Sequence, residues 1–454
     1  MKADIGRMTF DPAKHFTRVV LQQGRVQVEA DWNEQVAILL DAVRALAADL
    51  VGPWGGSPRA FRVDTVGGVP RDVSLGAGHY YVDGVRVVND AADVCYTSQP
   101  FYPVPDDERL TAEKKPQDYL LHLDVWERLV TAAEDPALQD VALGGLDTAA
   151  RAQPVWQVRA TPVGPKELAG ITCQTMPDEW PRLRDRIAPP NRGLMRARAR
   201  ITEEELDRPC AIDPAAGYRF DENALFRVEI HRDGTSGPPS IKWSLDNGCV
   251  ALPITSFAGE TLHLATLGRD PRLTLDVGDR VELEWDDQVL RNRPLPLMEV
   301  TDVDPTDLTV MVTPAPAPVP ATQHPRLRRW DQKDRRHTPL AADGTVDLTD
   351  AAGKGRGWID LAHGVQVEFV PVPGTVFRTG DFWLVEARTA VGDVVWPQVP
   401  GPDGGTVPAA LPPRGVDHHR APLAWVRVAV DGTVTVLARY VRELRPSVVC
   451  PTGP

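Results

Sequence analysis

Residues 222–245, ENALFRVEIHRDGTSGPPSIKWSL, contain the pattern that decides the fold class. Phe226, Val228 and Ile230 alternate with polar residues, which is typical of a β-strand that lays one face on a core. Asp233-Gly234 marks a turn, and a second alternating run through Trp243 follows it. The stretch therefore predicts two antiparallel strands with a short connection.

The same signal recurs along the chain. Residues 79–89 read as a hairpin around Asp83-Gly84, residues 119–126 as a strand, and residues 424–440 as a hairpin around Asp431-Gly432. The 43 prolines and 36 glycines punctuate many short elements. We therefore expect a mainly β protein built of several small β-barrel or sandwich modules, with one N-terminal amphipathic helix and short linker helices.

The N-terminal helix is the clearest helical pattern. Asp31 is placed to cap it with Glu34 three residues on, and Gly52-Pro53 ends it. Its apolar residues fall on one face: Val36, Leu39, Leu40, Val43, Leu46, Ala47 and Leu50. Before it, residues 16–28 read as an extended, β-like arm. Such a helix cannot bury its stripe alone, so it must pack on its own body or on a neighbour.

Changes of composition divide the chain into six predicted parts. They are an arm plus helix (1–53), a β domain (54–160), a charged linker with a short solvated helix (161–210), a β-barrel or sandwich (211–320), a loop-rich linker (321–355) and a C-terminal β region (356–454). The proline-rich run at 314–325 reads as a stiff hinge or spacer between two of these parts.

Bulk composition narrows the function classes. The chain has 454 residues, 42% of them hydrophobic, and a net charge of −13, which disfavours a nucleic-acid partner. Its five cysteines, at 95, 173, 210, 249 and 450, show no disulfide or zinc spacing and read as reduced thiols. Neither a signal peptide nor an apolar run of about 18 residues appears. We expect cytoplasmic synthesis without a signal peptide, no membrane span, and no secretion signal of its own if the protein leaves the cell.

Residue types that could support catalysis or metal binding form no recognisable catalytic set in this sequence. His418-His419 could ligate a metal only from a loop, and Asp302, Asp304 and Asp307 read as an ordinary turn. Arginines at 326, 328, 329, 335 and 336 surround Trp330 with aspartates among them, so a salt-bridged loop is favoured over a nucleic-acid site. We therefore assign no catalytic, cofactor or metal residues, and place most of the twelve tryptophans in cores and a few in interfaces.

Several long patches resemble one family. They are FTRVVLQQGRVQVEADWNEQ (16–35), LLHLDVWERLVTAAEDPALQDVALGGLDTAARAQPVWQVR (120–159), ENALFRVEIHRDG (222–234), IKWSLDNG (241–248), GWIDLAHGVQVEF (357–369), FRTGDFWLVEARTAVGDVVWP (377–397) and HHRAPLAWV (418–426). Together they are similar to an uncharacterised family encoded with phage-tail-like contractile injection systems. One departure is Glu29, where that family would have an aspartate.

The resemblance implies a structural part of a contractile tail at the baseplate, in a fibre or as an accessory, with other tail subunits as partners and homo-oligomers allowed. It brings no active site. The candidate docking residues lie in the arm and the first helical turn: Phe16, Arg18, Gln22, Gln23, Gly24, Arg25, Asp31, Trp32, Asn33 and Glu34. An arm of this kind can add a strand to a neighbour's sheet, or can pack on its own domain.

Two other functions remain open at this point. A glycan-binding module at a particle tip would need exposed tryptophans, and a polysaccharide hydrolase would need two close carboxylates in a cleft.

Overall fold

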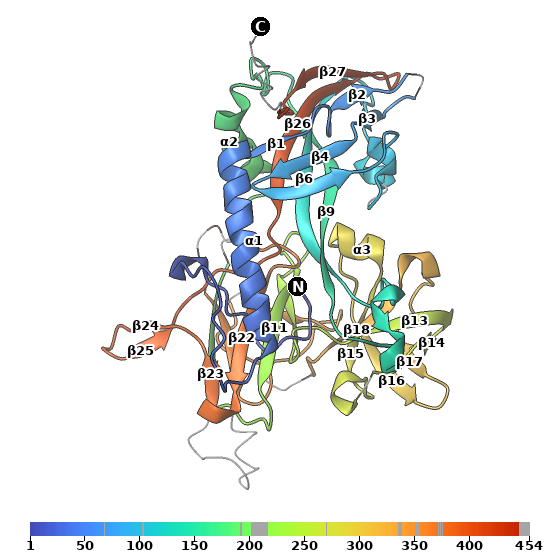
Figure 1. Cartoon of the computed structure of the whole chain (residues 1–454). Coiled ribbons are helices and arrows are strands. Elements are labelled where there is room, and N and C mark those ends of the chain that lie inside the picture. The colour runs from blue at the N-terminus through green and yellow to red at the C-terminus, as the bar shows by residue number, and fades with distance from the viewer. Residues whose placement is uncertain are drawn as a thin grey trace.

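A computed structural model describes residues 1–444 except 68, 102–103, 191–192, 201–216, 269, 335–337, 350–354, 371, 373 and 375. The described part is mainly β, as predicted, and holds three hydrophobic cores with three α-helices. Figure 1 shows the sheets around β6 at the top, those around β11 and β22 below, and a barrel at the lower right. The long helix α1 runs along the outside.

The first core belongs to an outer module built from both ends of the chain. A four-stranded sheet of order β27-β26-β6-β9 packs with the smaller sheets β1-β4-β5 and β2-β3. The strands are β1 (Trp54–Gly56), β2 (Val63–Thr65), β3 (Val73–Leu75), β4 (Gly78–Val82), β5 (Val85–Asn89), β6 (Gln117–Val130), β9 (Arg151–Val163), β26 (His419–Val428) and β27 (Val434–Arg439), with a small excursion β7 (Gln139–Asp140) and β8 (Leu146–Asp147).

The second core belongs to a middle module inserted between β9 and β26. Its main sheet has the order β19-β12-β11-β22-β23, and a smaller one has the order β10-β21-β20. The strands are β10 (Leu194–Ala199), β11 (Ala224–Arg232), β12 (Ser240–Ser244), β19 (Val346–Asp347), β20 (Ile359–Asp360), β21 (Val365–Val370), β22 (Phe382–Arg388) and β23 (Asp393–Val395), with a separate hairpin β24 (Gln398–Pro400) and β25 (Thr406–Pro408).

The third core is the inside of a closed six-stranded barrel, β13-β14-β17-β16-β15-β18, inserted between β12 and β19. The strands are β13 (Ala251–Ala258), β14 (Thr261–Leu264), β15 (Arg280–Glu284), β16 (Met298–Asp304), β17 (Thr309–Thr313) and β18 (Arg326–Trp330). Alternate residues such as Val281 and Leu283 point inward, as strand geometry requires. The α-helices are α1 (Glu29–Val51), α2 (Met176–Ile187) and α3 (Asp286–Arg291).

The predicted hairpins at 79–89 and 424–440 are confirmed as β4–β5 and β26–β27. The sheets do not follow the predicted divisions, however. β26 belongs to the sequence's C-terminal region but pairs with β6, and β11 and β12 lie in the middle module and not in the barrel. The proline-rich run joins β17 to β18 of one barrel, so it is not a spacer between modules.

The segment expected to be a charged linker with a solvated helix also differs in its described residues. α2 buries Met176, Trp180 and Leu183 in the first core, and β10 pairs with β21. Dense charge on the other faces of α2 concealed this apolar stripe in the sequence.

Candidate docking surface

The outward face of α1 is the main apolar surface that the described residues leave uncovered. This 23-residue helix fully buries only Ala30 and Ile38. Exposed fractions on its apolar face reach 55% for Leu39, 62% for Val43 and 77% for Leu50. Most protein helices gain their stability by burying such a face, so an uncovered one is unusual.

Six of these side chains form a continuous line, here called the α1 seam. Its members are Trp32, Val36, Leu39, Val43, Leu46 and Leu50, with exposed fractions of 39–77%. In Figure 1, α1 runs along one side of the molecule, with the dark-blue N-terminal segment beside its lower half and α2 near its upper end.

A few contacts hold α1 on the body. It contacts β1 and β4 of the outer module, and the Arg44 Nη2 atom lies 2.7 Å from the Glu127 Oε1 atom on β6. The β4–β5 turn approaches the helix backbone closely, because a Cβ built on Gly84 would lie 2.1 Å from the Arg44 carbonyl oxygen. This close backbone contact and the half-exposed ion pair help to fix the helix on the body, together with the buried Ile38 side chain.

The first turn of α1 is organised differently from the prediction. Val28 is the N-cap, and the Asp31 carboxylate inside the first turn accepts the Val28 backbone N–H at 3.3 Å. Glu34 accepts a hydrogen bond from the Thr9 hydroxyl, and the Glu29 carboxylate accepts the Gly6 N–H at 2.9 Å. Acidic residues stabilise a helix N-terminus, and these also tie α1 to the preceding chain.

The arm before α1 is extended but joins no sheet in the described structure. The predicted strand run at 16–21 is not hydrogen-bonded as a strand, although the Val19 N–H donates to the Gln35 side chain at 2.8 Å. A turn at Gln22–Arg25 follows, with Gly24 at a φ of +72°. Exposed fractions are 65% for Val20 and 87% for Val26.

The predicted docking residues thus fall into two groups. Asp31 and Glu34 are half-buried and bond within the chain, as described above. The remaining eight are exposed on the arm, its turn and the first turn of α1: Phe16, Arg18, Gln22, Gln23, Gly24, Arg25, Trp32 and Asn33. The predicted docking residues end at Glu34, whereas the exposed apolar face continues from Val36 to Leu50 on the helix for which the sequence predicted a packing partner.

The first residues of the chain are part of the body. The Lys2 Nζ atom lies 3.0 Å from Glu284 Oε1 on β15 and 3.5 Å from Glu229 Oε1 on β11. Ile5 packs on Leu225 and its neighbours, and the Asn247 amide donates to the Ala3 carbonyl at 2.9 Å. Lys2 therefore lies between the barrel and the middle module, and Ile5 lies on the middle module.

Lys2 joins a set of buried charges between these two parts, here called the ionic layer. It comprises Lys2, Arg227, Glu229, Lys242, Glu282, Glu284, Arg326 and Arg328. Burial alone would raise the pKa of Glu229, but the charges of Lys2, Arg227 and Lys242 outweigh it and hold the pKa far below its usual range. The layer works as an internal contact.

The arginines predicted to form a loop lie in this layer instead. Arg326 and Arg328 stand on β18, and the Arg328 Nε atom lies 2.8 Å from Glu284 Oε1. Their outward face is buried because β12 of the middle module lies against β18. Arg335 and Arg336 lie outside the described residues. The salt-bridged interpretation holds for the described arginines, and these guanidinium groups face carboxylates.

The histidine pair takes separate partners. The His418 Nδ1 atom lies 2.9 Å from Asp124 Oδ1, and the His419 Nδ1 atom lies 3.2 Å from Asp83 Oδ2. Among the described residues, no group of three or more His, Cys, Asp or Glu side chains is arranged to hold a metal ion. Cys95, Cys173 and Cys249 are free thiols, and Cys210 and Cys450 lie outside the described part.

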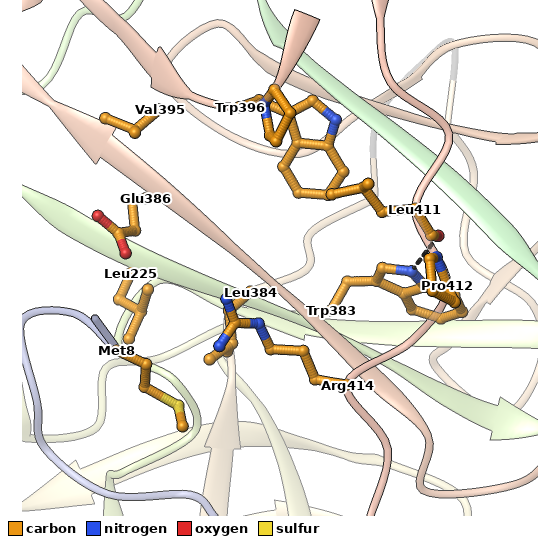
Figure 2. Close-up of a pocket in the computed structure, with 11 residues that line it drawn as sticks. Met8, Leu225, Trp383, Leu384, Glu386, Val395, Trp396, Leu411, Pro412 and Arg414 are labelled. Carbon is orange, nitrogen blue, oxygen red and sulfur yellow. Dashed lines mark hydrogen bonds between the residues drawn. The ribbon is translucent and has the colours of Figure 1, made fainter. Parts of the chain in front are cut away.

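A small pocket lies beside β22 where the N-terminal segment passes (Figure 2). Met8 reaches it from the N-terminal segment that precedes the arm, and Trp383, Glu386 and Arg414 line it from the middle module. Its volume of about 120 Å³ is below the roughly 300 Å³ that small-molecule sites usually provide. Glu386 is the single carboxylate in its lining, so this pocket lacks the acidic pair that a hydrolase would need.

Tryptophan exposure bears on the glycan-binding alternative. All twelve tryptophans lie in the described part, and Trp32 alone is exposed, at 65%. In the pocket, the Trp383 indole N–H donates to the Leu411 carbonyl at 2.9 Å, and this residue is 1% exposed (Figure 2). Trp243 and Trp383 are core residues as predicted, and Trp285 is half-buried against the barrel core. The one tryptophan free to stack on a ligand belongs to the α1 seam.

No helix within the described ranges is both long and apolar enough to cross a membrane. Comparison with known proteins gives one match: a family model described as a family of unknown function, DUF6519, covers residues 1–167 and 182–435. No curated protein and no solved structure matches the chain.

Proposed function

The chain belongs to a family of unknown function, DUF6519, and we propose that it is a structural docking subunit of a phage-tail-like contractile particle. On this proposal it is synthesised and assembled in the cytoplasm, and leaves as part of a released particle. It acts through contacts with other subunits at the baseplate, in a fibre or as an accessory.

The exposed apolar surface of the arm and α1 is the observation that carries this proposal. Phe16, Val20, Leu21 and Val26 on the arm and all six members of the α1 seam have exposed fractions above one third. Monomeric proteins rarely expose contiguous apolar patches larger than a few hundred Å² unless these are interaction sites. The strands of the same molecule bury most of their apolar side chains in the three cores.

The extended arm adds a specific way to bind. Between the Val19 contact and the start of α1, its backbone runs outside every sheet of the described structure. Free N–H and C=O groups of such a segment can pair with the edge strand of a neighbour. The placement in a contractile particle rests on the sequence patches that resemble proteins encoded with such systems.

Substitutions in the arm test the proposal better than its deletion, because removing the first residues would also remove Lys2 from the ionic layer. We expect the variant V20D/L21D/V26D to fold but to be lost from particles, since each added carboxylate would be desolvated at the interface. Particles purified from the native host are sedimented, and the fraction of the chain that sediments with them is measured by immunoblot.

The matched control is V141D/V277D/V391D, which changes three valines that are 91%, 62% and 66% exposed elsewhere. This control should sediment with particles as the parent does. If the arm variant also sediments at the parent level, the docking function of the arm is refuted.

A further inference from the structure

We propose that α1 pairs with α1 of a second copy of this chain as a short, parallel, two-stranded coiled coil. This inference rests on the proposed function, because it names what covers the α1 seam. Pairing of two copies would cover the α1 seam alone. The arm would remain available to other subunits.

The spacing of the seam is that of a coiled coil. Its six residues follow one another at intervals of four, three, four, three and four, which is the heptad repeat of alternating a and d positions. Val36, Val43 and Leu50 take the a positions, and Trp32, Leu39 and Leu46 take the d positions. A helix that packs only on a globular body usually has a wider, less regular apolar face.

The residue types within the seam favour two parallel strands. β-Branched residues at a with leucine at d select parallel dimers, and Val36 and Val43 with Leu39 and Leu46 give this combination in the centre of the seam. Trp32 is the one bulky member. It stands at the N-terminal end, where two helices can diverge.

The positions that flank the seam are nearly free of charge. Parallel pairing brings each g residue beside the following e residue of the second copy, which places Gln35 next to Leu40 and Ala42 next to Ala47. No like charges meet in these pairs. Asp41 and Arg44, the charged residues of the helix centre, lie away from the seam, and Arg44 is held by Glu127 of the same chain.

The size of the surface is sufficient for a specific contact. With exposed fractions of 39–77%, six large side chains leave on the order of 600 Å² of mainly apolar surface on each helix, so pairing would remove on the order of 1,000 Å² in total, close to the lower limit for a stable interface. α1 is already folded on its own body, so pairing does not have to order a free helix.

The oligomeric state of the purified full chain tests the inference. We expect the parent to be a dimer at tens of micromolar by sedimentation velocity, and V43E to be a monomer because two glutamates would meet in the seam. The control A45E adds the same charge at an exposed position of the same helix outside the seam. It should remain a dimer, and circular dichroism should show that all three proteins keep their fold.

The orientation is tested by a cysteine at a d position. In a parallel pair the two copies of residue 46 lie opposite each other, within the Cα separation of roughly 4.4–6.8 Å that a disulfide requires. Mild oxidation of L46C should therefore give a covalent dimer that the parent, under the same conditions, does not give. A dimer that V43E abolishes but L46C does not cross-link would overturn the parallel arrangement.

Failure of this inference is distinguishable from failure of the docking function. A monomeric parent, or a V43E protein that stays dimeric, overturns the pairing of two copies. If V43E then also fails to sediment with particles, another subunit covers the seam and the docking function stands. If the chain dimerises through the seam while the arm variant still enters particles, the pairing stands and the docking function of the arm fails.

Discussion

At the scale of single residues, buried ion pairs of the ionic layer stabilise the contact between the barrel and the middle module. The Lys242 Nζ atom on β12 lies 2.5 Å from Glu282 Oε2 on β15, and the Trp330 indole N–H donates to the same carboxylate oxygen at 2.9 Å. All three side chains are almost completely buried. A buried ion pair is stable only while both partners are present.

We predict that Lys242→Met destabilises the chain by about 3–5 kcal/mol, because the Glu282 carboxyl would remain in a buried site without its nearest cation. The double variant K242M/E282Q should lose less than the two single variants together, by about 1–3 kcal/mol. Urea denaturation followed by tryptophan fluorescence measures these differences.

Lys333 supplies the matched control for this cycle. Its ammonium lies 3.8 Å from Asp279 Oδ1 and its side chain is 60% exposed, so Lys333→Met should change the stability by less than about 1 kcal/mol. Equal effects of Lys242→Met and Lys333→Met would show that the ionic layer does not stabilise the contact.

At the scale of elements, the position of α1 depends on the turn between β4 and β5. The Asp83-Gly84 pair predicted a hairpin because tight hairpin turns need residues that adopt a positive φ. Gly84 has a φ of +81°. The structure adds a second reason, since the α1 backbone at Arg44 occupies the space of a side chain there. One glycine therefore serves both the turn and the docking of the helix.

We predict that Gly84→Ala loosens α1 from the body, because the new Cβ would overlap the Arg44 carbonyl. Hydrogen–deuterium exchange should become faster in residues 38–51 while the strands of the outer module keep their protection. Gly144→Ala is the matched control, with a φ of +75° and no atom within 4 Å of the added Cβ. If both variants leave α1 equally protected, the close approach does not hold the helix.

Local patterns predicted elements better than they predicted burial. The alternation of Phe226, Val228 and Ile230 gave β11 correctly, but the intervening Arg227 and Glu229 seemed to mark a solvent face. Both faces of β11 are buried, because the barrel brings opposite charges to the second one. The sequence of a single strand does not indicate which distant part of the chain will cover its polar face.

At the scale of the whole molecule, the modules are nested. The barrel lies within the middle module, between β12 and its partner β19, and the middle module lies within the outer one, between β9 and β26. Boundaries drawn from composition assume that modules follow one another along the chain. The apolar face of α1 could be recognised from the sequence because it is a local pattern, whereas nesting depends on pairings such as Val426 with Tyr119.

Two buried histidines, one in the outer module and one in the middle module, make the stability of the fold depend on pH. His122 on β6 of the outer module and His231 on β11 of the middle module are buried, and each has a ring nitrogen with no hydrogen-bond partner. Burial lowers the pKa of each from 6.5 to about 4. Both histidines are therefore neutral in the folded chain across a pH range in which the unfolded chain binds protons.

We predict that the free energy of unfolding falls as the pH drops from 6.5 toward 4, by up to about 1.4 kcal/mol per pH unit for each histidine. Above pH 6.5 neither state binds the proton and the contribution vanishes. Carboxylates whose pKa is held low, such as Glu229, act only below about pH 4.5. Burial also lowers the pKa of the Met1 amino group from 8.0 to about 5, so this group reduces the stability between pH 8 and 5 as well, and the histidine contribution is the difference between the parent and a variant without the two histidines. Urea midpoints of the parent should decline between pH 6.5 and 5, and those of H122Q/H231Q should decline less steeply. A parent with equal midpoints at pH 5 and pH 7, or a double variant that declines as steeply as the parent, would show that these two side chains do not couple protonation to folding.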